Sequence, residues 1–327
     1  MKRVEIGNLP TPIQKLEKLS EKLSRNIYIK RDDFTGIEVS GNKVRKLEYV
    51  LGYAMEKGFN TIITVGALQS NHCRATAAVC AKYNLKCHLV LKEAPFQTPE
   101  GNMFFDILLG AKLHRLSESE FENVDDYILK LKEELDNGGN KALTVPVGAS
   151  NEIGSLGYVN AMEEIFYQEK KLGVEFDLIA LTVGSGGTYA GSIYGVNKYF
   201  KMNKDVLGFA VADNKEIFKE KIKGILQKMY EESNEESLDY NKIMLNDDYV
   251  GEGYGKPYDE ELKFIKYLAK KEGIILDPVY TGKAFYGLCN MIKSGKLKNY
   301  KNILFIHTGG IFGWSEQMRN KILKEDF

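Results

Sequence analysis

The stretch Leu178-Ile-Ala-Leu-Thr-Val-Gly-Ser-Gly-Gly-Thr188 places a largely apolar run directly before a glycine-rich turn. The run has the length and composition of a buried strand, and residues 188–200 favour a helix. Glycines let backbone N–H groups approach an anion closely, and a helix N-terminus adds partial positive charge. The stretch therefore predicts a strand–turn–helix unit of an α/β fold with a phosphate site at the turn.

The turn departs from two familiar phosphate motifs. The dinucleotide fingerprint requires a third glycine where Tyr189 stands, and a P-loop requires Gly-Lys-Ser/Thr where the chain has Gly191-Ser192-Ile193. We therefore expect a phosphate monoester rather than a dinucleotide or a Mg-bound nucleoside triphosphate. A glycine-rich turn that binds nothing is the alternative. The expected phosphate-binding residues are Gly184, Ser185, Gly186, Gly187 and Thr188.

Similar units lie on both sides of this stretch. Short apolar runs followed by longer amphipathic ones are typical of βαβ units and a parallel sheet. One series opens at 61–65 and another at 178–183, which predicts two α/β units with a ligand cleft between them. Expected strands are 61–65, 87–91, 113–116, 142–147, 178–183 and 206–212, and expected helices are 71–83, 102–110, 119–135, 153–170, 188–200 and 214–231.

The polar segment 231–248 has no apolar stripe of helical period in its middle. We expect a surface excursion or a lid there, and a solvated loop without function is at least as common a case.

Length and composition are those of a soluble globular protein. The 327 residues, 43% hydrophobic and 28% charged, suit one large or two closely linked domains. Lys plus Arg and Asp plus Glu number 45 each, so no net field attracts nucleic acid or anionic lipid. The N-terminal residues show no secretory signal, and no apolar run approaches the roughly 18 to 20 residues that cross a bilayer. We expect a cytoplasmic protein without nucleic-acid or membrane partners.

The cysteines Cys73, Cys80, Cys87 and Cys289 form no Cys-x-x-Cys motif, and the four histidines do not cluster with them. A zinc site is not expected, and a disulfide framework is unnecessary at this size. The prediction is buried, reduced thiols and no bound metal.

Lys43 ends the run Ser40-Gly41-Asn42-Lys43 before an amphipathic helix. An isolated lysine is ordinarily a solvated surface charge. Imine chemistry requires instead an amine that is partly desolvated or close to a cation, so that it can be neutral and nucleophilic. Lys43 is therefore a candidate nucleophile if the fold buries it.

Polar residues also follow the strand 61–65, in the order Gln69-Ser70-Asn71-His72. One of them could simply cap the next helix. Four in a row equally suit a turn that contacts a carboxylate or a cofactor, because ligands of open α/β sheets bind at the carboxyl ends of the strands. Tyr254, Tyr280 and His307 lie near other turns, where core packing is the common role.

In combination and order, these motifs resemble the tryptophan-synthase-β-like (fold type II) pyridoxal phosphate (PLP) enzymes. Within them, the chain resembles the D-cysteine desulfhydrase and 1-aminocyclopropane-1-carboxylate (ACC) deaminase family, from Leu9-Pro-Thr-Pro-Ile13 and Lys30-Arg-Asp-Asp-Phe34 to His307-Thr-Gly-Gly310. The resemblance implies two open, twisted, mainly parallel sheets flanked by helices, with PLP in the cleft between two domains. The small domain would span 47–158, and the large one would combine 1–46 with 159–327. A homodimer is also implied.

The resemblance further implies roles by position. Lys43 would hold PLP as a Schiff base, and the turn from Gly184 to Thr188 would bind its phosphate. Asn71 would contact the PLP 3′-oxygen, and Ser70, Asn71 and His72 the substrate carboxylate. Tyr254 and Tyr280 would line the reacting face. Thr308 would meet the pyridine nitrogen, with Thr281 also near the ring. The catalytic set would be Lys43, Tyr280, Tyr254 and Ser70, with either the Lys43 amine or the Tyr280 phenolate removing the α-proton.

One position separates the two main activities of the family. ACC deaminases resemble Asp-Pro-Val-Tyr-Glu, whereas this chain has Thr281 after Tyr280, and Thr308 at the strand end. A carboxylate keeps the pyridine nitrogen protonated, which suits cyclopropane opening, whereas a hydroxyl suffices when a good β-leaving group departs. The two threonines favour β-elimination from a small amino acid, with D-cysteine the first choice. Elimination from L-cysteate, L-cysteine, serine or 2,3-diaminopropionate, ACC deamination, and a PLP carrier or regulator without efficient turnover are the alternatives.

Overall fold

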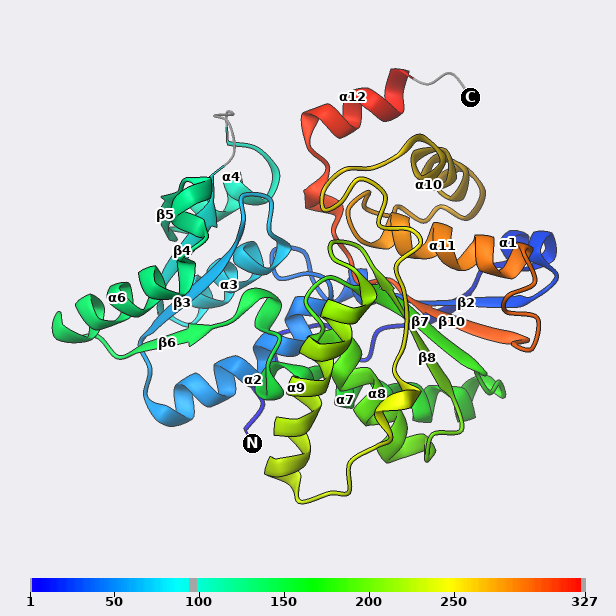
Figure 1. Cartoon of the computed structure of the whole chain (residues 1–327), viewed down its shortest axis with the longest axis horizontal. Helices are drawn as coiled ribbons and strands as arrows, with labels where there is room; N and C mark the ends of the chain where they lie inside the picture. Colours follow the sequence, from blue (N-terminus) through cyan, green and yellow to red (C-terminus); the bar gives the residue numbers. More distant parts are fainter. Residues whose placement is uncertain (1, 94–98, 325–327) are drawn as a thin grey trace.

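The computed structural model describes residues 2–93 and 99–324. Two sheets lie side by side in the molecule (Figure 1). In the larger sheet β1 pairs antiparallel with β2, and the other pairings are parallel. Its strand order is β1 (Ile13–Lys15), β2 (Asn26–Lys30), β10 (Asn302–Ile306), β7 (Leu178–Val183), β8 (Asp205–Ala210) and β9 (Met244–Asn246).

The smaller sheet is parallel throughout. Its central strands and β7 of the larger sheet are covered on both faces, which explains why they occur in the sequence as nearly continuous apolar runs. The predicted α/β fold with two mainly parallel sheets is confirmed. The strand order of the smaller sheet is β5 (Lys112–Leu116), β4 (Lys86–Lys92), β3 (Thr61–Ala67) and β6 (Ala142–Val145).

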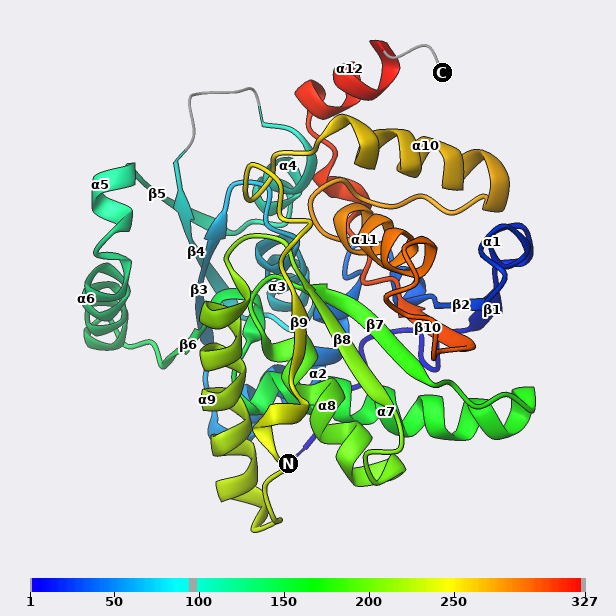
Figure 2. The same ribbon diagram turned by 45° about the vertical axis from the view of Figure 1, so that its right-hand side comes forward.

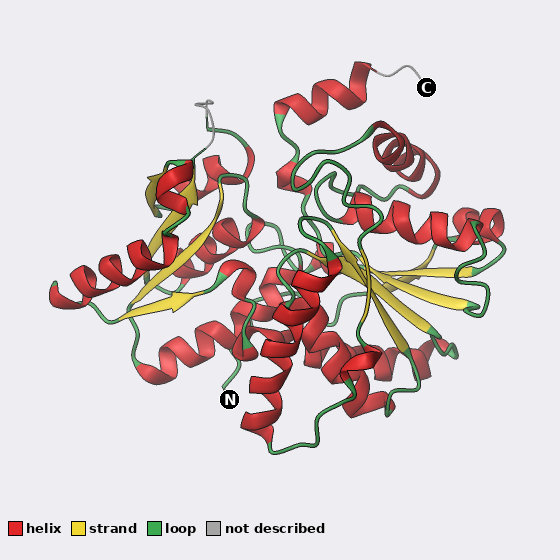
Figure 3. Ribbon diagram, viewed as in Figure 1, coloured by secondary structure: helices red, strands yellow, loops and turns green. Residues whose placement is uncertain are grey.

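Helices cover both faces of the larger sheet (Figures 2 and 3). One face carries α7 (Glu152–Leu172), α8 (Gly187–Phe200) and α9 (Lys215–Ser233), and the other carries α1 (Glu17–Leu23), α10 (Asp259–Glu272) and α11 (Thr281–Lys293). On the face that packs against α11, the rings of Phe285 and Phe305 stack with centroids 4.4 Å apart.

The smaller sheet is packed between helices in the same way. One face packs on α2 (Asn42–Lys57) and α3 (Asn71–Lys82), with α4 (Gly101–Leu108) beside α3, and the other packs on α6 (Val124–Asn137), which follows the short α5 (Glu118–Phe121). The last helix is α12 (Glu316–Lys324), and 3-10 turns occur at η1 (Asp32–Phe34), η2 (Val147–Ala149), η3 (Tyr240–Lys242) and η4 (Ile311–Gly313).

Most expected elements occur with ends shifted by at most two residues, and one expected helix is divided. The expected helix 119–135 is divided, because Ser117 and Glu120 form a capping box that starts α5, and α6 begins only at Val124. The expected strand 142–147 ends at Val145, since Pro146 has no N–H to donate to a ladder.

The segment 231–248 lies mostly at the surface, as expected, but it also holds regular structure. It contributes η3 and the edge strand β9, which pairs with β8. Leu238 and Ile243, only 7% and 6% exposed, pack into the core of the larger sheet. Leu238 and Ile243 are its two buried apolar residues. Two apolar residues five positions apart form no helical or strand period, so the sequence pattern does not reveal that they are buried.

Two helices join the sheets. The predicted domain boundaries, 46/47 and 158/159, fall inside α2 and α7 respectively, so each helix passes from one unit to the other. The division into domains 47–158 and 1–46 plus 159–327 remains a prediction. All four cysteines are buried and free. Within residues 2–93 and 99–324, none of the helices combines the length and apolarity that crossing a membrane requires.

Candidate active site

A cavity of about 1130 Å³ lies where the strands of both sheets end. Its wall combines the start of α2 with residues that follow β3, β7 and β10. The fold thus brings together residues that are far apart in the sequence. The predicted site residues on this wall are Lys43, Ser70, Asn71, His72, Gly184, Ser185, Gly186, Thr188, Tyr254, Tyr280 and Thr308.

Two predicted residues, Gly187 and Thr281, are not on the wall. Gly187 packs against Ser150, whose Cα would be 2.7 Å from an added Cβ. Thr281 is fully buried at the start of α11, where its hydroxyl donates to Asp277 Oδ1 at 2.6 Å and accepts from the Asp277 N–H at 2.9 Å. The Thr281 hydroxyl is therefore engaged within the chain, and its implied place beside the pyridine ring remains a prediction.

Lys43 is the second residue of α2 and is half-buried on the cavity wall. Its Nζ donates to Asn42 Oδ1 at 2.8 Å, and Asn42 Nδ2 donates to Thr188 Oγ1 at 3.0 Å. Burial lowers the pKa of Lys43 to about 8, because the charged amine loses its hydration. The Asp277 carboxylate attracts the charge and raises the pKa in part, whereas the nearby Arg74 charge lowers it further. Lys43 is thus the desolvated amine that imine chemistry needs.

Close backbone approach brings Thr308 next to this lysine. Gly41 has a φ of 78°, and a Cβ there would lie 2.4 Å from the Thr308 carbonyl oxygen. The same oxygen accepts the Asn42 N–H at 3.1 Å. Only glycine fits this position, so packing against the turn after β10 requires the glycine of the Gly-Asn-Lys run.

The glycine turn after β7 has a second buried cation behind it. Lys46, 1% exposed, donates from Nζ to the Gly148 carbonyl at 3.0 Å and to Ser150 Oγ at 3.1 Å. Ser150 Oγ in turn lies 2.7 Å from Ser185 Oγ of the turn. Burial, together with the charge of Lys43, lowers the pKa of Lys46 well below its usual range. The turn and the free N–H groups at the start of α8 suit an anion. Lys46 is not on the cavity wall, and it holds Ser150 behind the turn.

Sequence reasoning missed Lys46, although a signal existed. Residues three apart share one face of a helix, so Lys43 and Lys46 point to the same side of α2. Asn42 stands out in the sequence only as a member of the Gly-Asn-Lys run, and the structure shows it linking Lys43 to the glycine turn.

The start of α3 offers donors from its backbone. Ser70 caps the helix by accepting the Cys73 N–H at 3.2 Å, and Asn71 Oδ1 accepts from Asn102 Nδ2 at 2.9 Å. The first N–H groups of any helix have no partner within it, and the dipole there favours an anion. These N–H groups and the Ser70 hydroxyl proton are the donors that a carboxylate would need there, and the substrate contact itself remains a prediction.

The His72 side chain contributes differently from the sequence expectation. Thr64 Oγ1 donates to the Val145 carbonyl at 2.8 Å, so His72 Nε2, 2.8 Å away, donates to Thr64. Burial lowers the pKa of His72 well below its usual range, which leaves Nδ1 as an unprotonated acceptor. The neutral ring has no donor left for a carboxylate, and only the backbone N–H of His72 can serve.

Two tyrosines of the cavity wall meet through their hydroxyl groups. The hydroxyls of Tyr254 and Tyr280 are 2.6 Å apart. Burial raises the pKa of Tyr280 well above its usual range, and the Tyr254 neighbour adds to this effect. A Cβ on Gly184 would lie 3.0 Å from Tyr280 Cε1, which places the tyrosine ring against the glycine turn.

His307 is a satisfied core histidine. It lies 3.0 Å from the Ile275 carbonyl through Nε2, and Nδ1 accepts the Gly309 N–H at 3.2 Å. The ring is therefore neutral, with its proton on Nε2, and it holds the turn that carries Thr308.

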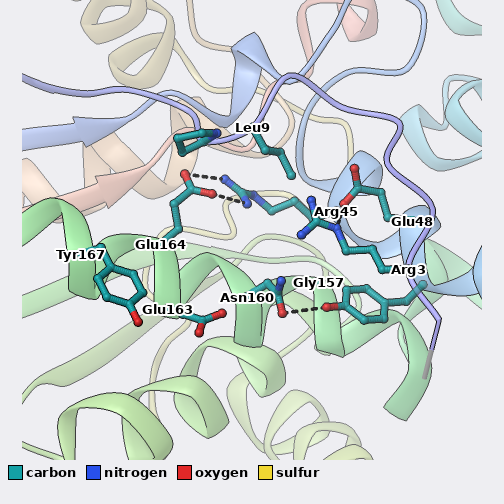
Figure 4. Close-up of a pocket in the computed structure, with 11 residues that line it drawn as sticks. Arg3, Leu9, Arg45, Glu48, Gly157, Asn160, Glu163, Glu164 and Tyr167 are labelled. Atoms are coloured by element: carbon teal, nitrogen blue, oxygen red, sulfur yellow. Dashed lines mark hydrogen bonds and ion pairs between the residues drawn. The ribbon is translucent and has the colours of Figure 1, made fainter.

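A smaller cavity, about 250 Å³, lies on the opposite side of α2 (Figure 4). Two ion pairs join four of its five charged lining residues. Arg3 Nε donates to Glu48 Oε2 at 2.8 Å, and Arg45 Nη1 donates to Glu164 Oε2 at 3.0 Å. None of the predicted site residues contributes to this lining, so the chemistry belongs to the larger cavity.

The unpaired polar atoms of the larger cavity test whether the residues fit PLP. Within the described part of the chain, His72 Nδ1 and Thr182 Oγ1 are buried on the wall and have no hydrogen-bond partner. Buried polar atoms nearly always have one, so both require a partner from outside the chain. With the Lys43 amine suited to an aldehyde and the turn beside Lys46 suited to a phosphate, the residues fit PLP.

Comparisons with known proteins agree with this chemistry. Residues 4–309 match the family described as pyridoxal-phosphate dependent enzymes. A Thermotoga maritima protein that carries the provisional name 1-aminocyclopropane-1-carboxylate deaminase is 43% identical over 324 residues, 98% of this chain and 100% of that one.

Two further similarities bear on the activity and the fold. The bifunctional D-cysteine desulfhydrase/1-aminocyclopropane-1-carboxylate deaminase of Arabidopsis thaliana is 39% identical over 321 residues, 94% of this chain and 78% of that protein. A crystal structure described as an ACC deaminase homologue superposes with a TM-score of 0.91 at 38% identity, covering 99% of this chain and 96% of that one.

Proposed function

The chain belongs to the pyridoxal-phosphate dependent enzyme family, and we propose that it converts D-cysteine and water to pyruvate, hydrogen sulfide and ammonia by β-elimination of the thiol. At the coarser level it is a PLP-dependent lyase of the ACC deaminase/D-cysteine desulfhydrase family. When bound, PLP supplies the electron sink that stabilises negative charge at the substrate α-carbon. The residues of this chain orient the substrate and move its protons.

The choice of D-cysteine over ACC depends on which side chains stand at positions 281 and 308. After β10 the chain presents the Thr308 hydroxyl, and position 281 holds a threonine engaged with Asp277 rather than a glutamate. The Asp277 carboxylate is itself saturated, because it accepts the N–H groups of Val279, Tyr280 and Thr281. A hydroxyl in place of a carboxylate supports loss of a good β-leaving group better than opening of a cyclopropane.

The electrostatics support Lys43 as the group that takes the α-proton. With its pKa lowered to about 8, a useful fraction of this amine is neutral near pH 7. The pKa of Tyr280 is instead raised, so the phenol keeps its proton. Tyr280 and Tyr254 are better suited to donate a hydrogen bond to the departing sulfur than to act as bases.

ACC deamination is the second candidate, because the names of the relatives include it. β-Elimination from L-cysteate, L-cysteine, serine or 2,3-diaminopropionate would use the same residues, with discrimination by the cavity wall. A PLP carrier needs only the lysine and the phosphate turn, so the hydrogen-bonded tyrosines and the free N–H groups of α3 favour an enzyme.

The test is a substrate panel on the purified, PLP-loaded protein. We expect a yellow protein that forms pyruvate from D-cysteine faster than from L-cysteine, L-cysteate or serine. Formation of α-ketobutyrate from ACC at a comparable rate would contradict the choice of D-cysteine. A protein that stays colourless with added PLP would contradict the cofactor. The homodimer and the cytoplasmic location remain predictions, and light scattering after size-exclusion chromatography tests the first.

A further inference from the structure

A buried lysine outside the reacting set lies beside the loop that carries Tyr254. Lys283 is the third residue of α11 and is fully buried. Its Nζ donates to the carbonyl oxygens of Val250 and Gly253, each at 2.7 Å. The two acceptors lie on either side of a tight turn, immediately before Tyr254.

This location is unfavourable for a lysine in itself. A cation in the first turn of a helix opposes the helix dipole, and burial lowers the pKa of Lys283. The buried carboxylate of Glu261 on α10 is close enough to influence that pKa, yet its two oxygens have no hydrogen-bond partner within the described residues. The hydrogen bonds of Lys283 therefore go to the loop rather than to the carboxylate.

The loop itself has few other restraints. Gly251, Gly253 and Gly255 have φ angles of 65°, 115° and 73°, a region that glycine enters freely and that leaves the unrestrained chain many conformations. Tyr254 is 42% exposed, and its ring meets that of Tyr280 edge-on, with centroids 5.8 Å apart. Its hydroxyl also lies 2.6 Å from that of Tyr280 in the cavity. Something other than burial must hold it there.

We propose that Lys283 is a positioning residue, which holds Tyr254 against Tyr280 by binding the Val250 and Gly253 carbonyls. The inference rests on the proposed function for its kinetic consequence, since Lys283 touches neither substrate nor cofactor. It acts on the reaction only through the placement of the Tyr254 hydroxyl.

The kinetic test is a double-mutant cycle on the PLP-loaded enzyme. Lys283→Met keeps the aliphatic volume and removes the donors, and we expect kcat for pyruvate formation to fall about 10- to 100-fold, the scale of a misplaced catalytic group. KM and the visible spectrum should change little. In a Tyr254→Phe background the same substitution should have almost no further effect, because the group that Lys283 positions is already gone. A merely structural role would lower kcat equally in both backgrounds and would overturn the proposal.

A second measurement does not depend on turnover. Amide hydrogen exchange of the peptide covering 249–258 should be faster in Lys283→Met than in the wild type, because the tether on two carbonyls is lost. The matched control is Lys293→Met, which removes an exposed lysine from the last turn of the same helix and should change neither exchange nor kcat. Unchanged exchange in Lys283→Met would overturn the tether.

The outcomes separate the two proposals. Faster exchange in Lys283→Met, alongside a wild type that makes no pyruvate from D-cysteine, would sink the proposed function and leave the tether standing. If Lys283→Met does not fold, Lys283→Gln retains one donor and is expected to give a smaller change of the same kind in both measurements. Additive kinetics in that variant would again overturn the proposal.

Discussion

The two sides of helix α2 carry basic side chains whose pKa values are shifted in opposite directions. On the side of the larger cavity, Lys43 and Lys46 have lowered pKa values and hydrogen-bond to neutral oxygens. On the other side, Arg45 is as buried as Lys46, and its pKa is raised. Burial disfavours the charge at all three positions, so burial alone does not explain the difference.

The partners explain it. Arg45 makes a two-bond ion pair with Asp32, with Nε to Oδ2 and Nη2 to Oδ1 both at 2.8 Å, and it also binds Glu164. Asp32 further accepts the hydroxyls of Tyr158 at 2.6 Å and Thr11 at 2.7 Å. Planar guanidinium and carboxylate groups match, and the remaining lone pairs are filled. Arg45, with two carboxylate partners, is thus a fixed structural charge, whereas Lys43, which hydrogen-bonds to a neutral amide, is available for chemistry.

The largest effect is expected on the chemical side, from Lys43→Ala. Losing a proton-transfer group alone reduces a rate by about 10²- to 10⁴-fold. Pyruvate formation should fall by at least that much, while the free energy of unfolding changes little, because no carboxylate loses its partner. Steady-state assays and urea unfolding of the apoprotein check the two halves. A variant that retains the visible absorbance of a lysine-bound PLP would show that another lysine, such as Lys46, holds the cofactor.

Arg45→Met should instead lower the unfolding free energy, because Arg45 pairs with buried carboxylates. Removing the arginine leaves the Asp32 and Glu164 carboxylates buried and partly unpaired, which costs about 3 to 5 kcal/mol of unfolding free energy. Urea denaturation measures this loss. The matched variant Arg45→Met with Asp32→Asn should recover part of it, because one stranded charge is removed. A loss within about 1 kcal/mol for the single variant would mean that the pairing contributes little, as at exposed sites, and would remove the contrast between the two sides.

Lowering the pH should reduce the unfolding free energy through the Arg45–Asp32 pair. Burial alone would raise the pKa of Asp32, but Arg45 holds it at about 2, below the ordinary 3.8. A depressed pKa adds stability above the ordinary value, about 2 kcal/mol here, and this is lost as the pH falls from about 4 through 2. Unfolding free energies measured between pH 5 and 2 should therefore fall less steeply for Asp32→Asn than for the wild type. Equal slopes would contradict the depressed pKa.

The same contrast shows what a sequence can reveal. The glycine turn at 184–188 and the Gly-Asn-Lys run were predictable, because backbone conformation restricts which residues fit and leaves a local pattern. The pairing of Arg45 with Asp32 and Glu164 was not, since the partners are 13 and 119 residues away and meet only where η1 and α7 lie against α2. Lys283 has the same difficulty, because its acceptors are backbone carbonyls, which every residue type carries.

Ser70 lies between the two kinds of group and gives the smallest expected effect. Its oxygen accepts the Cys73 N–H as the cap of α3, while its own proton remains free to donate into the cavity. Ser70→Ala should lose about 1 kcal/mol of unfolding free energy with the cap. Ser70→Asp restores a capping oxygen but adds a charge that repels a substrate carboxylate, so stability should return while kcat/KM stays reduced. If kcat/KM returned along with stability, Ser70 would be a cap alone, and the carboxylate site would consist of the backbone N–H groups of α3.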